Sequence, residues 1–180
     1  MIVPNAIKVQ ERVNKKNAIQ FFKTHSYLFN IENNPFTNLE NTLGVIYIVR
    51  DPRNVVTSLS NHMAISTEEA ARIMIEEYKF GGNLLSKGSD RTRVYMGTWS
   101  GNYNSWKSLK TPNRYLLIKY EDLISNRDFI FRKVIKFLYQ LNGTKFIIDQ
   151  KRFKRAIEST DFERLKNLEK SKGFDEAKVH

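Results

Sequence analysis

Three short segments of the chain are predominantly apolar and differ from the mixed apolar and polar sequence around them. They are AIQFF at residues 18–22, VIYIV at residues 45–49 and YLLI at residues 115–118. Each contains β-branched or aromatic residues without a strict alternation of polar positions, which is typical of a strand covered on both faces. We therefore predict three buried strands of a mainly parallel sheet.

Helical patterns separate these predicted strands. Asp51 and Pro52 predict a helix start, because aspartate is a good N-cap and proline is tolerated in the first turn. Ser66 and Glu69 form a capping box that opens another helix. Strands that alternate with helices indicate an α/β fold, here with three layers and a mainly parallel sheet flanked by helices. The length of 180 residues predicts a single domain.

Basic and polar side chains directly follow each predicted strand. Lys23 and His25 follow the first strand, Arg50 follows the second, and Lys119 and Tyr120 follow the third. Ligands of open α/β sheets bind outside the carboxyl ends of the strands, so we expect these side chains to form one basic rim. Such a rim suits a phosphorylated ligand.

Arg50 stands where the second strand passes into a helix. Its guanidinium is suited to bidentate contact with phosphate, and the helix is expected to direct N–H groups and its positive dipole end to the same region. Asn54, Ser58 and His62 are spaced by four and share a helix face, so Ser58 is expected to donate to an anion held by Arg50. Taken alone this signal is weak, because an arginine after a strand is more often a surface ion-pair partner.

His25 allows two interpretations. A single histidine at a strand end more often has a structural role. With Lys23 two residues before it, the pair has the composition of a base and an electrophile, because histidine accepts protons near neutral pH and an ammonium stabilises developing negative charge.

Composition narrows the classes of partner and site. The net charge of +11 favours anionic partners, among them nucleic acid, acidic membrane surfaces and small molecules that carry phosphate or sulfate. The absence of cysteine excludes disulfides, thiolate metal sites and cysteine nucleophiles, and is compatible with a reducing compartment. No apolar run approaches the roughly 20 residues of a membrane span, and we find no signal peptide. We therefore expect a cytoplasmic protein.

Five segments together resemble, in order, those of the cytosolic-type sulfotransferases. They are FFKTHSYLF, IYIVRDPRNVVTSLSNH, GTWSGNYNSW, IKYEDLISN and STDFERLKNLEKSKGF. The resemblance runs from about Phe21 to Phe174, nearly the whole chain. The arginine–serine pair with its spacing of eight, the Lys-Thr-His triplet and the Tyr-Glu-Asp-Leu segment are specific only in combination. The resemblance implies the P-loop-like fold of that family.

The resemblance also implies a reaction. Members of this family transfer the sulfuryl group of 3′-phosphoadenosine 5′-phosphosulfate (PAPS) to a hydroxyl or amine of an acceptor, a small molecule or a glycan. Carried over to this chain, His25 is the base that deprotonates the acceptor, and Lys23 assists at the sulfuryl group. No metal is implied.

The same resemblance assigns the residues that bind the co-substrate. Arg50 and Ser58 match the positions that bind the 3′-phosphate. Tyr120 matches a residue that touches the adenine, Phe162 one that stacks on it, and Thr160 one that lies nearby. All five are therefore expected to bind PAPS.

Three parts of the family pattern are not found in the sequence. The 22 residues before Lys23 contain no glycine, so they lack the loop that cradles the 5′-phosphosulfate with backbone N–H groups. The Arg-Lys-Gly loop that completes the 3′-phosphate pocket would follow the last residues of the chain. Asn102 stands where such segments usually carry a histidine, which leaves its role open. We therefore expect an incomplete sulfotransferase fold, truncated at both ends, that keeps the 3′-phosphate half of the donor site.

The sequence leaves alternatives open. Besides an active transferase, a non-catalytic remnant that binds 3′-phosphoadenosine nucleotides or a partner chain fits the missing loops. A basic nucleic-acid-binding module fits the charge, but no recognised nucleic-acid motif supports it, so we do not expect nucleic acid as the partner. A nucleotide kinase is disfavoured because no Gly-x4-Gly-Lys-Ser/Thr loop is present. The acceptor, the activity of these residues alone and the oligomeric state are not determined by the sequence.

Overall fold

The computed structural model describes residues 6–14, 19–76, 94–109 and 111–173. The described helices and strands, in chain order, are α1 (Ala6–Asn14), β1 (Asn30–Ile31), β2 (Asn34–Pro35), β3 (Val45–Val49), α2 (Pro52–Met63), α3 (Thr67–Ile75), α4 (Trp99–Ser108), β4 (Tyr115–Lys119), α5 (Tyr120–Ser125), α6 (Arg127–Leu141), α7 (Gln150–Ser159) and α8 (Phe162–Lys172). No helix in these ranges is both long and apolar enough to cross a bilayer.

The central sheet is formed by β3 and β4, which pair in parallel. The register runs from Val45 opposite Tyr115 to Val49 opposite Lys119. Both strands coincide with predicted apolar runs, so these two strands and their parallel arrangement are confirmed. A separate antiparallel hairpin is formed by the two-residue strands β1 and β2.

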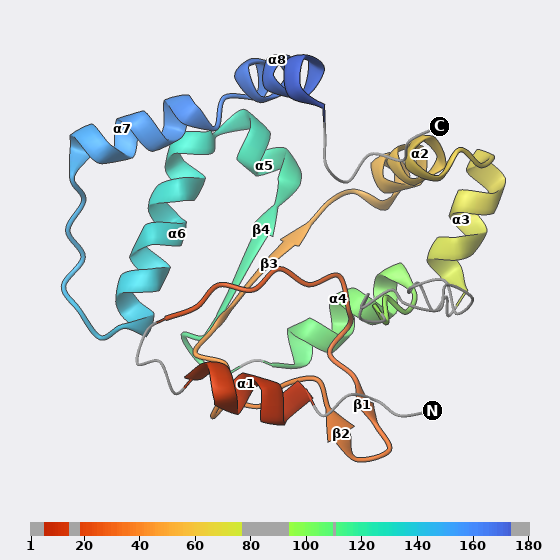
Figure 1. Ribbon diagram of the computed structural model, residues 1–180, viewed down its shortest axis with the longest axis horizontal. Coiled ribbons are helices and arrows are strands. Elements are labelled where there is room, and N and C mark those ends of the chain that lie inside the picture. The colour runs from red at the N-terminus through yellow and green to blue at the C-terminus, as the bar shows by residue number, and fades with distance from the viewer. Residues whose placement is uncertain (1–5, 15–18, 77–93, 110, 174–180) are drawn as a thin grey trace.

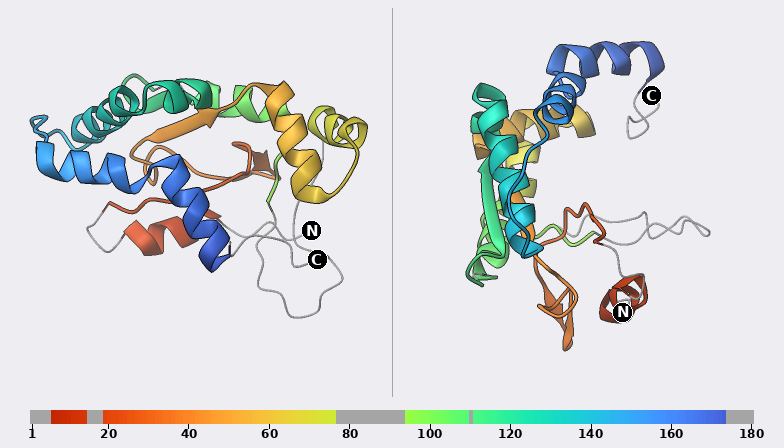
Figure 2. Two further views of the ribbon diagram at one scale, coloured as in Figure 1. Left: turned by 90° about the horizontal axis from the view of Figure 1, so that it is seen from above. Right: turned by 90° about the vertical axis from the view of Figure 1, so that its left-hand side faces the viewer.

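Helices lie on both sides of this sheet. In Figures 1 and 2, α6 lies on one side of β3 and β4, and α2, α3 and α4 lie on the other. The predicted layering of helix, sheet and helix is thus present. The chain enters α2 and α5 at the carboxyl ends of β3 and β4, so both helices begin at the same end of the sheet (Figure 1).

The prediction of a strand at AIQFF, residues 18–22, is wrong for the part of it that the structure describes. Residues 19–22 form no strand, and Phe21 and Phe22 are 72% and 71% exposed. Within the described ranges β3 and β4 pair only with each other. An apolar segment becomes a buried strand only where a neighbouring strand supplies backbone hydrogen bonds and a second layer covers it. Within the part of the chain that the structure describes, residues 19–22 have neither a paired strand nor a covering layer.

Both predicted helix starts are confirmed. The Asp51 side chain accepts a hydrogen bond from the Arg53 amide at the start of α2, with proline in the first turn. The Ser66 side chain accepts one from the Glu69 amide at the start of α3. Short polar side chains satisfy amide groups that the first helical turn leaves without partners, which explains why these positions were readable from the sequence.

A buried aromatic group holds the segment after Phe22 in place. The rings of Phe29 and Tyr95 meet edge to face with centroids 5.2 Å apart. Trp106 in α4 is 6% exposed, and its Nε1 donates to the Ser26 carbonyl at 2.9 Å. The segment that contains Lys23 and His25 is therefore held by α4 rather than by sheet hydrogen bonds.

Replacing Trp106 tests this anchoring. We expect Trp106→Ala to lower the free energy of unfolding by about 3–5 kcal/mol, because a large buried ring is lost. Trp106→Phe removes the Nε1 donor while keeping a ring and is expected to cost about 1 kcal/mol. Urea unfolding measures both values. Trp99→Phe is the matched control on the same helix, since Trp99 is only half-buried. A loss of stability in Trp99→Phe as large as that in Trp106→Phe would contradict the anchoring role of Trp106.

Candidate functional site

The carboxyl end of β3 opens onto a pocket. The pocket has a volume of about 200 Å³ and is lined by Arg50, Val55, Ser58, Leu59 and His62. Arg50 comes from the end of the strand, and the other four residues come from one face of α2. The structure thus brings together Arg50 and Ser58, as the sequence predicted, and adds His62, which the sequence placed only on the same helix face as Ser58.

Arg50 is held at the edge of this pocket by Tyr120. The guanidinium carbon of Arg50 lies 4.9 Å from the centre of the Tyr120 ring. Its Nε is buried and has no hydrogen-bond partner among the described residues. A buried donor without an acceptor costs free energy, so this atom suits a ligand that supplies an acceptor oxygen.

The backbone at the start of α2 corrects one expectation. We expected N–H groups at this helix start to face the ligand, but Asp51 already engages those of the first turn. Its side chain accepts from the Arg53 amide at 2.9 Å, and its carbonyl accepts from the Asn54 and Val55 amides, each at 3.0 Å. Pro52 has no N–H. The residue that caps the helix therefore already accepts from the backbone amides that an anion at this helix start would need.

Two acidic residues near Arg50 are engaged elsewhere. Arg53, mainly through side-chain hydrogen bonds, lowers the pKa of Asp51 to about 2. The pKa of Glu121 is also lowered, mainly because its carboxylate accepts from the Asp51 amide at 3.0 Å, with a smaller effect from the charge of Arg50. Both carboxylates stay ionised at neutral pH, and neither accepts a hydrogen bond from the Arg50 Nε.

The predicted catalytic residues lie apart from the pocket lining. Lys23 and His25 are both exposed, on the segment that α4 holds, and neither lines the pocket beside Arg50. The two groups of predicted site residues are therefore separate clusters, and a side chain of α4 connects them.

Asn102 in α4 provides that connection. Its Nδ2 donates to the carbonyls of His25 at 3.1 Å and Met96 at 2.9 Å, and its Oδ1 accepts from the Tyr47 hydroxyl at 3.0 Å. Tyr47 belongs to β3, three residues before Arg50. Burial, and to a smaller extent the charge of Tyr103, raises the pKa of Tyr47 to about 12, so its hydroxyl stays a donor at neutral pH. The sequence had left the role of Asn102 open.

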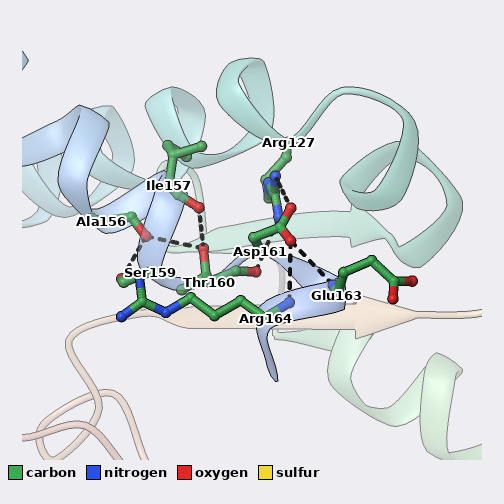
Figure 3. A network of polar contacts seen from close by, with 8 residues as sticks. All are labelled: Arg127, Ala156, Ile157, Ser159, Thr160, Asp161, Glu163 and Arg164. Atoms are coloured by element: carbon green, nitrogen blue, oxygen red, sulfur yellow. Dashed lines mark hydrogen bonds and ion pairs between the residues drawn. The ribbon is translucent and has the colours of Figure 1, made fainter. Parts of the chain in front are cut away.

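Thr160 lies in the turn between α7 and α8, and Phe162 is the first residue of α8. Figure 3 shows that Arg127, the first residue of α6, fixes this turn. Its guanidinium donates to the Thr160 carbonyl at 3.0 Å and to the Asp161 carboxylate at 3.1 Å. The Thr160 hydroxyl donates to carbonyls of the preceding helix, and Phe162 is 57% exposed. Neither residue lines the pocket beside Arg50, and the anchoring role of Arg127 was not predicted.

Comparison with known protein families identifies the fold family. A model of the sulfotransferase domain matches residues 2–178. The chain belongs to the sulfotransferase family. Two curated sulfotransferases, each 26% identical over 52% of this chain, are mouse sulfotransferase 2A6 and the guinea-pig 3-beta-hydroxysteroid sulfotransferase. The alignments cover 30% of each of these proteins.

Solved structures agree with this sulfotransferase fold. Mouse sulfotransferase SULT7A1 complexed with PAP gives a TM-score of 0.55 at 20% identity, over 76% of this chain and 45% of that protein. Retinol dehydratase in complex with androsterone and inactive cofactor PAP gives a TM-score of 0.53 at 17% identity, over 98% of this chain and 53% of that protein. The chain thus spans about half the length of these proteins. At such identities the likeness concerns the fold, and the predicted α/β sulfotransferase fold is confirmed.

Substitution of Asn102 tests its place between the two clusters of this sulfotransferase domain. Asn102→Ala leaves two carbonyls and one hydroxyl without a partner, so we expect a loss of about 1–3 kcal/mol and a Tm lower by roughly 2–4 °C per kcal/mol. Hydrogen exchange should accelerate in residues 23–29. The control is Asn104→Ala, an exposed position of the same helix, and equal effects in both variants would contradict this role.

The Arg127–Asp161 contact predicts a pH dependence. The amide of Arg164 and the side chain of Arg127 lower the pKa of Asp161. A lowered carboxyl pKa stabilises the fold above the ordinary value of 3.8, and this stabilisation is lost as pH falls through the folded value. We expect Asp161→Asn to lower the Tm at pH 7, and the difference from the unchanged protein to shrink as the pH falls below the ordinary carboxyl value. Glu169→Gln, with the same charge change on α8, should show no such pattern, and a difference that persists in acid would contradict the prediction.

Proposed function

We propose that this sulfotransferase domain binds the 3′-phosphate of PAPS in the pocket beside Arg50 and takes part in sulfuryl transfer to a hydroxyl or amine acceptor. The observation that carries the proposal is the buried Nε of Arg50, which has no hydrogen-bond partner in the described part of the chain and lies next to Ser58 in one pocket. An arginine fork and a hydroxyl are the donors that a phosphate group requires. The PAP bound to both solved sulfotransferase-fold neighbours supports this nucleotide class.

Tyr120, Phe162 and Thr160 are proposed to receive the adenine. Tyr120 lies beside Arg50, so an adenine placed on it would lie next to a 3′-phosphate held by that guanidinium. Phe162 offers an exposed ring, which is available for stacking on a base. Arg127 supports this role because it fixes the turn that directly precedes Phe162.

His25 and Lys23 are proposed to act on the transferred group. His25 accepts the proton that the acceptor loses, and Lys23 stabilises negative charge that develops at the sulfuryl group. Asn102 supports this assignment, because it ties the His25 backbone to the strand that ends in Arg50. PAPS supplies the sulfuryl group when it is bound, and a small-molecule acceptor is consistent with the androsterone bound to one neighbour.

Thermal unfolding with 3′-phosphoadenosine 5′-phosphate tests the phosphate site without requiring turnover. At about 100 times its dissociation constant the nucleotide should add roughly 2.7 kcal/mol, which corresponds to about 5–11 °C at this chain length. Arg50→Ala should abolish this shift. Arg155→Ala, which removes the same charge from an exposed position of α7, should keep it.

ATP, which lacks a 3′-phosphate, serves as the ligand control. A shift of equal size with ATP, or one that survives Arg50→Ala, would overturn the proposed site. A shift with the 3′-phosphate nucleotide and no transfer to any acceptor would restrict the function of these 180 residues to nucleotide binding.

A further inference from the structure

The pocket beside Arg50 must bind an anion through side chains. In many phosphate sites the backbone amides at a helix start supply most of the donors. Here the amides of Arg53, Asn54 and Val55 all donate to Asp51, and Pro52 carries no N–H. The carboxylate of Asp51 also contributes a negative charge at this helix end. A phosphate in the pocket therefore needs donors from other residues.

Three residues that line the pocket carry such donors. They are Arg50, Ser58 and His62, whereas Val55 and Leu59 are apolar. Ser58 and His62 are one helical turn apart on the same face of α2. Side chains of an α-helix point back toward its N-terminus, so the His62 imidazole extends toward the turn that contains Ser58. The imidazole has at least one N–H donor whether it is neutral or charged.

We propose that His62 is a third ligand of the anion held by Arg50 and Ser58, and that the pocket is specific for a phosphomonoester. A phosphomonoester presents three oxygens outside its ester bond and carries close to two negative charges at neutral pH. Arg50 supplies a permanent positive charge, and Ser58 and His62 each supply a further donor, so each ligand can meet one oxygen. This inference rests on the proposed function, in which the anion is the 3′-phosphate of an adenine nucleotide.

The ring signals of His62 provide a readout that does not depend on catalysis. The chain has three histidines, so its imidazole resonances are few, and His62→Gln assigns the one of interest. We expect inorganic phosphate and 3′-phosphoadenosine 5′-phosphate to shift the His62 resonances of the full chain in NMR titrations. The same titration on Arg50→Ala should leave them unmoved.

Affinity for the nucleotide gives the second readout. We expect His62→Ala to weaken binding of 3′-phosphoadenosine 5′-phosphate about tenfold, because a donor to a charged oxygen is lost, and His62→Gln, which keeps an N–H donor, to weaken it less. Affinity for adenosine, which carries no phosphate, should not change. Asn61→Ala is the matched control, since Asn61 neighbours His62 on α2 and does not line the pocket.

The outcomes separate this inference from the proposed function. Nucleotide binding that is unchanged in His62→Ala, with His62 resonances unmoved, would overturn the role of His62 and leave the proposed function intact. Phosphate that shifts His62 while the nucleotide fails to bind would overturn the proposed function and support the pocket as a phosphate site. If neither ligand shifts His62 or binds, both are overturned.

Discussion

The parallel pairing of β3 with β4 determines where the polar groups of this domain lie. The pairing ends with Val49 opposite Lys119, so the next residue of each strand, Arg50 and Tyr120, emerges at the same edge of the sheet. The guanidinium then lies over the Tyr120 ring at 4.9 Å. A register shift of one residue would turn every side chain of a strand to its opposite face and separate this pair. The site beside Arg50 is thus a direct consequence of backbone register.

A second constraint acts through side chains. The segment that carries Lys23 and His25 forms no strand, and yet it has a defined place, because α4 binds its backbone through Asn102 and Trp106. Asn102 also accepts a hydrogen bond from the hydroxyl of Tyr47 in β3. One amide therefore relates the backbone of the proposed base to the strand that ends in the proposed phosphate ligand. In the turn before α8, the Arg127 side chain likewise fixes the backbone, because it donates to both a carbonyl and a carboxylate there.

The sequence was informative where local chemistry decides the structure. The runs at residues 45–49 and 115–118 form β3 and β4, and Asp51 and Ser66 cap the starts of α2 and α3. Both kinds of feature were predictable because apolar runs and N-caps act within a few residues. The run at residues 18–22 could not be judged in this way, because a strand also requires a neighbour that the run itself does not specify. Likewise, the hydrogen bonds from Asn102 to His25 and from Arg127 to Thr160 join residues more than 30 positions apart, and no local pattern encodes them. The spacing of Ser58 and His62 was visible in the sequence, but only the pocket gave it meaning.

The way in which Asp51 closes the start of α2 has a consequence for how this site can diverge. Where backbone amides bind a phosphate, almost any sequence with the right turn offers the same donors, and single substitutions alter the chemistry little. Here the amides of the first turn of α2 are occupied, and the donors of the pocket are the side chains of Arg50, Ser58 and His62. Each can be exchanged without rebuilding the chain around it. The choice of anion in such a pocket can therefore change by one codon at a time, while the helix that bears it stays as it is.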